Sequence, residues 1–304
     1  MDSQTLAAAT REAAKPRFHG HSVLRPKFKP AAPDGIAREY VSLTNEYMAL
    51  FRDTIKKYAP EIKAAAREEW LEQNMRFDDA QSFFSSVRGL LDKIGMEFEL
   101  RARHFDLRRR LVRLGNAAKN RGFNEWRRLV KSALGIDLFK GYYKGEFYRA
   151  ALARWVDDNV NLIKTVPQNT LGRMREAVKE GYMNGLPASE IMAAIQEEYG
   201  IGKRHARFIA RDQIAKLNAD IAESQQRDAG VTEYIWSTSL DERVRDRHAE
   251  LEGKRFRWDD PPVVDERTGR REPPGRDYAC RCVALPVFDI NSLILPMSST
   301  EKGA

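Results

Sequence analysis

Hydrophobic side chains recur with helical spacing over most of the chain between residues 36 and 230. The clearest series is Leu100, His104, Leu107, Leu111 and Leu114, whose members are four, three, four and three residues apart. This spacing predicts a single α-helix with all five side chains on one face. Because His104 lies within this apolar series, we interpret it as a packed residue and not as a metal ligand.

Helix-breaking residues divide the same region into several predicted helices. Pro60 is expected to interrupt the first helix, and Pro167 to end the segment that begins near residue 151. Pro187 marks the start of another helix, and Gly200 lies just after its predicted end. The next predicted helix, from about residue 202 to 230, has a core-facing stripe formed by Ala206, Ala210, Ile214, Leu217 and Ile221.

The pattern differs at both ends of the chain. Residues 1 to 35 contain four prolines among basic residues and little periodicity, which is typical of an extended arm that becomes ordered only against a partner. Deletion of this arm is expected to leave the fold intact. After about residue 230, the segments VTEYIWSTS, KRFRWDD and ACRCVALPVF predict a small antiparallel sheet. Trp236 and Trp258 are expected in its core, with stacking on nucleic acid as the alternative.

These patterns predict a mainly α protein with a small C-terminal α+β module, in which a short antiparallel sheet packs on the long helix that begins near residue 203. A length of 304 residues favours two domains. We predict an extended basic arm over residues 1–35, a helical domain over 36–199, an α+β module over 200–290 and a flexible tail over 291–304.

Composition excludes a membrane protein. Charged residues make up 32% of the chain, the mean hydropathy is −0.59, and no run of about 18 apolar residues occurs. The N-terminus lacks the basic-then-apolar pattern of a secretion signal, so we expect a protein of the cytoplasm that makes no membrane contact. Two cysteines are too few for a disulfide framework.

The positive charge is concentrated in the middle of the chain. Residues 101 to 149 contain 14 basic and 4 acidic residues, which gives this segment a net charge of 14 − 4 = +10. The net charge of the whole chain is +8. Such a segment either attracts a polyanion, most often nucleic acid, or forms a solvated helix face. If it binds double-stranded DNA without sequence specificity, the candidate contacts are Arg103, Arg108, Arg109, Arg110, Arg113, Arg127 and Arg128.

Both cysteines lie in the segment PPGRDYACRC. If this segment is a strand, Tyr278, Cys280 and Cys282 share one face, and His248 would complete a set of ligands suited to zinc. A structural zinc site normally has four ligands, and the possible fourths are Asp241, Asp246, Asp277 and His205. Because free cysteines are commonly buried, we favour a metal-free core in which both thiols are buried and His248 joins a polar network, with zinc as the alternative. With or without a metal ion, we predict that the side chains of Cys280, Cys282 and His248 lie together as one spatial unit. A disulfide between cysteines one residue apart is disfavoured by geometry.

Signals for catalysis are weak. A nucleophile formed by a cysteine and His248 lacks a third, orienting residue, and a metal nuclease that uses His248 with Asp241 or Asp246 lacks the usual cluster of carboxylates. No nucleotide-binding GxxxxGK[ST] or GxGxxG motif occurs. We therefore predict no enzyme and no cofactor apart from the candidate zinc ion. Arg243, Arg245 and Arg247 flank His248 and are interpreted as a salt-bridged turn, with a phosphate or partner contact as the alternative.

The segments RFIARDQIAKLN, GVTEYIWSTSLDERVRDRHAELEGKRFRWDDPP, PPGRDYACRC and ALPVF resemble the phage Mu F-like minor head (head morphogenesis) proteins in order and spacing. The resemblance covers about residues 200 to 288 and extends more loosely back to 123. Asp212 and Gln213 stand where many relatives have Thr-Glu, which leaves the role of an acid there open.

The resemblance implies a minor component of a tailed-phage head. Such a protein is associated with the portal vertex and is needed for capsid assembly or genome handling. Its partners would be the portal protein and the major capsid or scaffold protein, and it would lie in the virion, in the capsid interior near the portal, after assembly in the host cytoplasm. The alternative is a DNA-processing enzyme of the phage head, a metal-dependent nuclease centred on His248.

Overall fold

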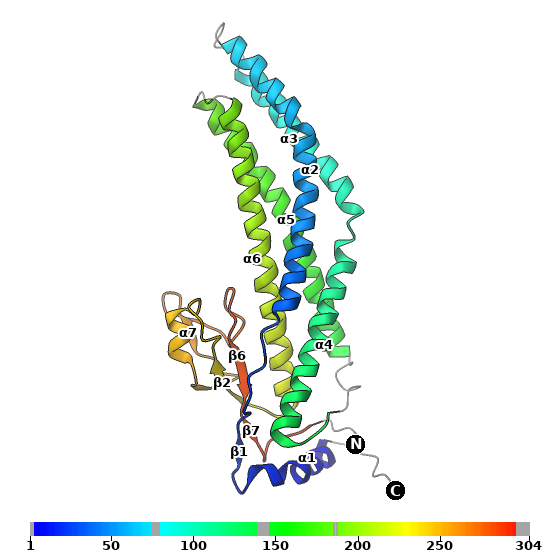
Figure 1. The fold of residues 1–304 in the computed structure, drawn as a ribbon, viewed down its shortest axis with the longest axis vertical. Coiled ribbons are helices and arrows are strands. Elements are labelled where there is room, and N and C mark those ends of the chain that lie inside the picture. The colour runs from blue at the N-terminus through cyan, green and yellow to red at the C-terminus, as the bar shows by residue number, and fades with distance from the viewer. Residues whose placement is uncertain (1–2, 74–79, 139–145, 185, 187, 296–304) are drawn as a thin grey trace. The chain divides into compact units, whose positions relative to one another are not determined.

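Long α-helices make up most of the protein in the computed structural model (Figure 1). The structure describes residues 3–73, 80–138, 146–184, 186 and 188–295. The long helices are α2 (Asp34–Gln73), α3 (Ala80–Arg103), α4 (Leu107–Leu134), α5 (Glu146–Met183) and α6 (Ala188–Asp228). Small antiparallel sheets follow α6 in the sequence, so the predicted fold class is confirmed. Within the described ranges, no helix is both long enough and apolar enough to cross a bilayer.

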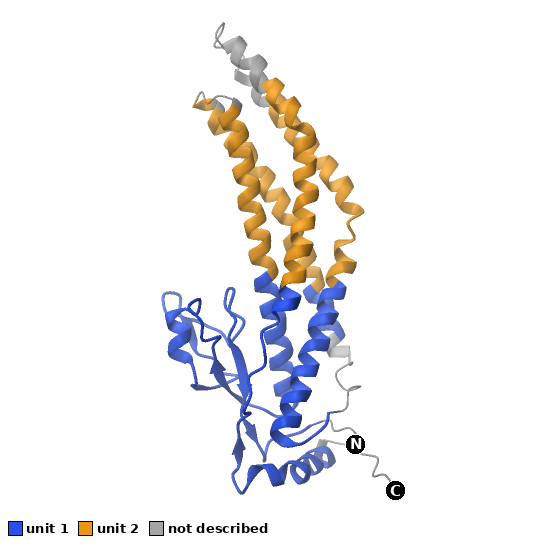
Figure 2. Ribbon diagram, in the orientation of Figure 1, with its two compact units in different colours: residues 1–37, 112–155, 211–304 blue, residues 38–111, 156–210 orange. Residues whose placement is uncertain are grey.

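The chain divides into two compact units (Figure 2). The first contains residues 1–37, 112–155 and 211–304, and the second contains residues 38–111 and 156–210. Several long helices therefore contribute residues to both units. The predicted four-region division, with boundaries after residues 35, 199 and 290, stays a prediction.

The helices continue through three positions at which the sequence predicts a break. Pro60 lies inside α2, Pro167 inside α5, and Gly200 inside α6. A proline in a helix interior costs roughly 3 kcal/mol, whereas burial of one large apolar side chain contributes about 1.5–3 kcal/mol. Ile62 and Val166, close to the two prolines, are among many buried side chains on these helices. Tertiary burial therefore outweighs the local cost of each break.

Gly202 lies where α5 and α6 approach each other within the second unit. A Cβ atom added to Gly202 would lie 2.3 Å from Oγ1 of Thr170. Thr170 is fully buried, and its hydroxyl donates a hydrogen bond to the carbonyl oxygen of Val166 at 2.7 Å. This glycine thus permits close helix packing and does not end a helix.

Inter-helix polar contacts also hold the second unit together. Arg101 of α3 donates to Thr54 Oγ1 of α2 at 2.8 Å, and Arg175 of α5 donates to Asp92 of α3 at 2.6 Å. The hydroxyl of Tyr199 on α6 donates to a carbonyl oxygen of α2 at 3.1 Å. Residues far apart in the sequence are therefore joined within this helical unit.

A turn separates α3 from α4 in the middle of the predicted stripe. Helix α3 ends at Arg103, Asp106 has a left-handed φ of 52°, and α4 begins at Leu107. Leu107, Leu111 and Leu114 are buried as predicted, whereas Leu100 is 57% exposed and His104 is exposed. The prediction of one continuous helix with a packed His104 is therefore wrong, because the turn redirects the chain between the two parts of the stripe.

The N-terminal region is a helix and a strand, and not the predicted extended arm. Residues Ser3–Phe18 form α1, in which Ala14 and Phe18 are buried. Strand β1 (Val23–Leu24) pairs antiparallel with β7 (Phe288–Asp289) near the other end of the chain. The arm prediction is wrong for these residues, because the low periodicity of the segment concealed apolar positions that pack against distant parts of the chain.

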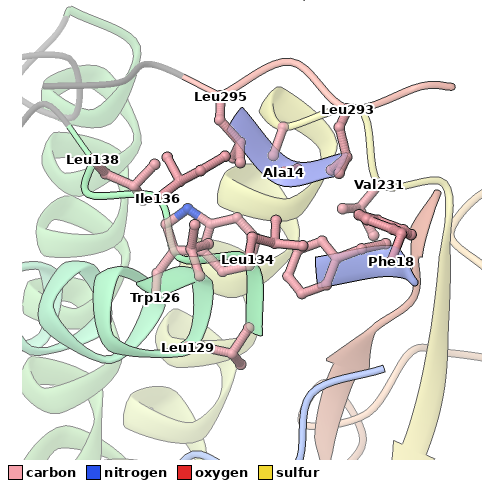
Figure 3. Close-up of a cluster of buried hydrophobic side chains, with 13 residues drawn as sticks. Ala14, Phe18, Trp126, Leu129, Leu134, Ile136, Leu138, Val231, Leu293 and Leu295 are labelled. Carbon is pink, nitrogen blue, oxygen red and sulfur yellow. The ribbon is translucent and has the colours of Figure 1, made fainter. Parts of the chain in front are cut away.

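Both ends of the described chain enter one hydrophobic cluster (Figure 3). Phe18 of α1 lies with Trp126 and Leu134 of α4, and with Leu293 and Leu295 from beyond β7. The amide of Leu295 donates to Thr10 Oγ1 at 3.0 Å. Residues 291–295 are therefore part of the core and not of a flexible tail, while residues 296–304 lie outside the described residues.

The C-terminal module contains a three-stranded antiparallel sheet in the order β3-β2-β6. Its strands are β2 (Glu233–Ser237), β3 (Arg255–Arg257) and β6 (Val283–Pro286), and a separate hairpin joins β4 (Val263–Asp265) to β5 (Arg270–Arg271). The sheet packs against α6, where the side-chain amide of Gln226 donates to the carbonyl oxygen of Ala284 at 3.0 Å. The predicted sheet is thus confirmed.

Candidate functional site

His248, Cys280 and Cys282 meet next to the three-stranded sheet. His248 lies on the short helix α7 (Asp246–Leu251), and both cysteines lie in the segment before β6. Ala279 has a left-handed φ of 47° and turns the chain immediately before Cys280. Tyr278 is consequently 57% exposed while both cysteines are buried, so the predicted shared face of all three side chains is wrong for Tyr278.

The His248 imidazole faces both sulfur atoms with the same nitrogen. Nδ1 lies 3.6 Å from Sγ of Cys280 and 3.7 Å from Sγ of Cys282. One ligand atom from each of the three residues lies within 4.8 Å of the others, and all three residues are buried. The prediction that they form one spatial unit is confirmed. Both cysteines are free thiols, as predicted, and metal binding stays a prediction.

Asp277 holds the opposite side of the imidazole. Its Oδ2 lies 3.0 Å from Nε2 of His248, and its carboxylate also accepts hydrogen bonds from Arg245 at 2.7 Å and from Arg270. Burial raises the pKa of Asp277, but the hydrogen bonds from Arg270 and the Tyr278 amide and the charge of Arg245 together lower it below its usual value. Because an ionised carboxylate can only accept a hydrogen bond, Nε2 is the donor to Asp277, and Nδ1 is the nitrogen that faces both sulfurs.

The two thiols have opposite pKa shifts. The pKa of Cys280 is lowered chiefly because its sulfur accepts a hydrogen bond from the Cys282 thiol; the interaction with His248 lowers it further, and together these outweigh burial. The pKa of Cys282 is raised because its proton is held by Cys280 and because burial disfavours a second thiolate. The amide of Cys282 also donates to Sγ of Cys280 at 3.4 Å. The Cys280 sulfur is therefore the stronger acceptor of the pair.

Aromatic side chains enclose the cluster. The Trp236 ring meets the His248 ring edge-on, with centroids 5.3 Å apart. Trp236, Trp258 and Tyr234 belong to the same buried group as the two cysteines. The interpretation of both tryptophans as core residues is confirmed, and the cluster lies in an apolar environment.

The four residues considered as a fourth ligand have other positions, and Asp246 is exposed at the start of α7. Asp241 accepts a hydrogen bond from Arg281 at 2.5 Å. Asp277 contacts the imidazole nitrogen that faces away from the sulfurs, and His205 belongs to the other compact unit. Among the described residues, the convergent set of metal-ligand types is His248, Cys280 and Cys282.

Asp212 anchors the turn that presents the cysteines. This residue of α6 is buried, and it accepts a hydrogen bond from the Ala279 amide at 2.8 Å and an ion pair from Lys216 at 2.7 Å. The sequence comparison left the role of an acid at this position open. The sequence suggested Asp277 only as a possible fourth ligand, and its contact with His248 was not predicted. The position of Asp277 three residues before Cys280 was the one sequence feature that pointed to a place beside His248.

The arginines that flank His248 form a salt-bridged turn, as interpreted from the sequence. Arg245 binds Asp277, and Arg247 pairs with Glu250 at 2.7 Å. Arg243 lies 3.7 Å from Asp241. These side chains stabilise the segment that carries His248.

The seven candidate DNA-binding arginines differ in how they are engaged. Arg108, Arg110 and Arg127 pair with carboxylates of other segments at 2.5 Å, namely with Asp157, Glu46 and Asp137. Among the described residues, Arg109 and Arg128 make only local pairs, at 3.8 and 3.3 Å, and their side chains are 79% and 71% exposed. Arg103 and Arg113 are exposed and make no ion pair within the described part of the chain. Of the seven candidates, the arginines still available to a ligand are therefore Arg103, Arg109, Arg113 and Arg128.

The fold and the site define a class of protein: a helical chain with a small C-terminal sheet module that packs on α6 and encloses a His–Cys cluster. Residues 173–285 match the family described as Phage Mu protein F like protein. The matched segment includes α6, α7, strands β2 and β3, both cysteines and all but the last residue of β6. The resemblance in the sequence is thus confirmed over these residues.

A protein of Haemophilus influenzae, named only as an uncharacterized protein, is 34% identical to this chain over 169 residues. The aligned residues are 56% of this chain and 36% of that protein, so the chain spans little more than a third of the relative's length. No solved structure matches the chain.

Proposed function

We propose that this chain is a minor head protein of a tailed phage, which acts in capsid assembly and in genome packaging or delivery near the portal. The observation that carries the proposal is the family match over residues 173–285. The protein partners would be the portal protein and the major capsid or scaffold protein. The chain would lie in the virion, in the capsid interior near the portal, after assembly in the host cytoplasm.

We also propose that the chain acts through contacts and not through catalysis. His248 is 2% exposed, and its two ring nitrogens face Asp277 and the two cysteine sulfurs. A metal-dependent nuclease needs a site that a phosphodiester and a water molecule can reach. The burial of this cluster favours a structural role for His248 over the nuclease alternative.

The DNA contacts in this proposal rest on the exposed arginines of α3 and α4. Arg103, Arg109, Arg113 and Arg128 present guanidinium groups that carboxylates of distant segments do not engage in the described structure. Contacts of this kind bind phosphates and carry no sequence information, so binding would be non-specific and sensitive to salt. This property fits a protein that handles a whole genome.

The protein contacts are supported by a residue in the loop between β2 and α7. Leu240 is 78% exposed and has a left-handed φ of 56°. Left-handed backbone costs a bulky residue roughly 1–2 kcal/mol, and such strain is retained most often at functional positions. We propose that Leu240 contacts a partner in the head.

The proposal is tested on purified heads of the phage that encodes this chain. Heads from wild-type phage and from a strain that lacks the protein are compared by mass spectrometry and by cryo-electron microscopy of the portal vertex. We expect density next to the portal that disappears in the deletion strain, together with a loss of packaged DNA. Absence of the protein from wild-type heads, with normal heads in the deletion strain, would overturn the proposal.

The Leu240 contact is tested by Leu240→Asn, because asparagine tolerates left-handed backbone better than leucine does. The variant should fold normally and be incorporated less well into heads. Leu100→Asn, at another exposed leucine, is the matched control. Equal incorporation of both variants into heads would show that Leu240 does not contact a partner, and would leave the proposed role as a minor head protein unchanged.

A further inference from the structure

We propose that His248, Cys280 and Cys282 bind one Zn²⁺ ion through Nδ1 and both Sγ atoms, and that Asp277 positions the imidazole for this role. The site would join helix α7 to the segment that leads into β6. It does not depend on the proposed role in the phage head.

The spacing of the ligand atoms matches that of a tetrahedral zinc site. Zinc lies about 2.3 Å from a thiolate sulfur and about 2.0–2.1 Å from an imidazole nitrogen, so at a tetrahedral angle these two ligand atoms are about 3.6 Å apart. The distances from Nδ1 to the two sulfurs are 3.6 and 3.7 Å. An ion could therefore bind with little movement of the three side chains.

The chemistry of the three ligands selects the metal. Two thiolates and one imidazole are soft and borderline donors, which favour zinc over the hard cations magnesium and calcium. The Cys282 amide donates to Sγ of Cys280 at 3.4 Å, and such bonds stabilise a thiolate ligand. All three ligand residues are buried beside Trp236, so solvent access to the metal would be low.

Asp277 supplies the outer contact that metal-binding histidines usually have. A ligating imidazole commonly donates its second N–H to a carboxylate, which fixes the ring orientation and the position of the proton. Asp277 lies 3.0 Å from Nε2 and is held in place by Arg245 and Arg270. A polar network in a metal-free core would also contain this contact, so the discriminating observation is that Nδ1 approaches both sulfurs equally, at 3.6 and 3.7 Å. The arrangement therefore favours a metal centre over a metal-free core.

Three protein ligands leave one coordination position. Among the described residues, no further histidine, cysteine or carboxylate joins the cluster of His248, Cys280 and Cys282. The fourth ligand of a tetrahedral site would come from outside this set of three residues. Because the three protein ligands come from α7 and from the segment before β6, the ion would hold these two parts of the C-terminal module together.

The first experiment measures metal content in the full-length chain, purified with a reductant that does not bind metal. We expect about one zinc ion per chain by mass spectrometry of the metal. Replacement of zinc by Co²⁺ should give the intense visible absorption of tetrahedral cobalt and a thiolate-to-cobalt charge-transfer band. Both signals should be lost in the Cys280→Ser/Cys282→Ser variant and in His248→Ala. His104→Ala, at an exposed histidine, is the matched control and should retain them.

The second experiment tests Asp277 as a positioning residue. Asp277→Asn should weaken zinc binding by about 10–100-fold while the stoichiometry at saturating zinc stays unchanged. Asp220→Asn is the matched control, because Asp220 accepts a hydrogen bond from Arg276 at 2.7 Å and is not part of the cluster. The control should bind zinc as tightly as the wild type.

The outcomes separate the metal centre from a metal-free core. Reduced wild-type protein that is folded, contains no zinc and gives no thiolate-to-cobalt band with excess Co²⁺ would overturn the proposal. So would equal zinc binding by the wild type and by the double-serine variant. If a variant does not fold, zinc dependence of refolding is measured on the wild type after chelation. Refolding that needs zinc supports the site, and refolding without any uptake of metal excludes it.

Discussion

Replacement of Phe18 by alanine tests whether helix α1 is part of the protein's core. Phe18 is 2% exposed and lies in one cluster with Leu134, Val231 and Leu293 (Figure 3). Removal of a buried phenylalanine side chain costs the transfer free energy of its atoms and that of the remaining cavity, together about 3–5 kcal/mol. Because α1 is one peripheral element that can partly relax into the cavity, we expect a loss of about 3 kcal/mol in the free energy of unfolding.

Urea unfolding, followed by tryptophan fluorescence, measures this loss, since Trp126 belongs to the same cluster. Phe208→Ala is the matched control, because Phe208 is 44% exposed and its removal should cost about 1 kcal/mol or less. Deletion of residues 1–35 should then destabilise the protein at least as much as Phe18→Ala does. If Phe18→Ala costs no more than Phe208→Ala, α1 does not contribute to the core and the arm predicted from the sequence is the better description.

Three further predictions concern other parts of the chain. Gly202→Ala should destabilise by about 1–3 kcal/mol, because its Cβ would lie 2.3 Å from Thr170 Oγ1. Gly172→Ala, which meets no atom within 4 Å, should stabilise by about 0.5–1 kcal/mol, and equal midpoints of thermal unfolding would contradict this packing argument. Replacement of Arg103, Arg109, Arg113 and Arg128 by Gln should flatten the slope of log K for DNA binding against log salt concentration by up to about 0.9 per lost phosphate contact. Four arginine-to-Gln replacements in the C-terminal module should leave this slope unchanged. Wild-type protein whose DNA binding does not depend on salt would refute the DNA contact. The control replaces Arg243, Arg257, Arg267 and Arg271. The hydrogen bond from Arg127 lowers the pKa of Asp137 in the folded protein. Ionised Asp137 therefore stabilises the native state at pH values above about 3.9, the pKa of Asp in the unfolded chain. This contribution is lost as the pH falls through the lower pKa that Asp137 has in the folded protein. Asp137→Asn should therefore cost up to about 1 kcal/mol at pH 7 and progressively less in acid, and a cost that does not depend on pH would exclude this origin.

The sequence by itself determined the fold class, the sheet and the members of the His–Cys cluster. Helical and alternating periodicities follow from local backbone geometry, so they can be read without knowledge of the fold. Trp236 and Trp258 were assigned to the core for the same reason, and the segments around His248 and Cys280 carried the resemblance to the phage Mu F-like proteins, a family that residues 173–285 match. The approach of His248 to both cysteines followed from the expectation that the sulfurs face one neighbour.

Only the tertiary structure decided where the helices end and which polar groups support the cluster. The sequence alone predicts helix breaks at Pro60, Pro167 and Gly200. In the folded protein, burial of neighbouring side chains against other helices outweighs the local cost of these residues, and the helices continue. The same long-range packing orders α1 and the residues around Leu293, which have too little local pattern to predict. The contact of Asp277 with His248 joins residues from a turn and a helix, 29 positions apart in the chain, and depends on the arginines that keep the carboxylate ionised. Such contacts are set by the path of the chain in space, because the free energy that holds them comes from partners distant in the sequence.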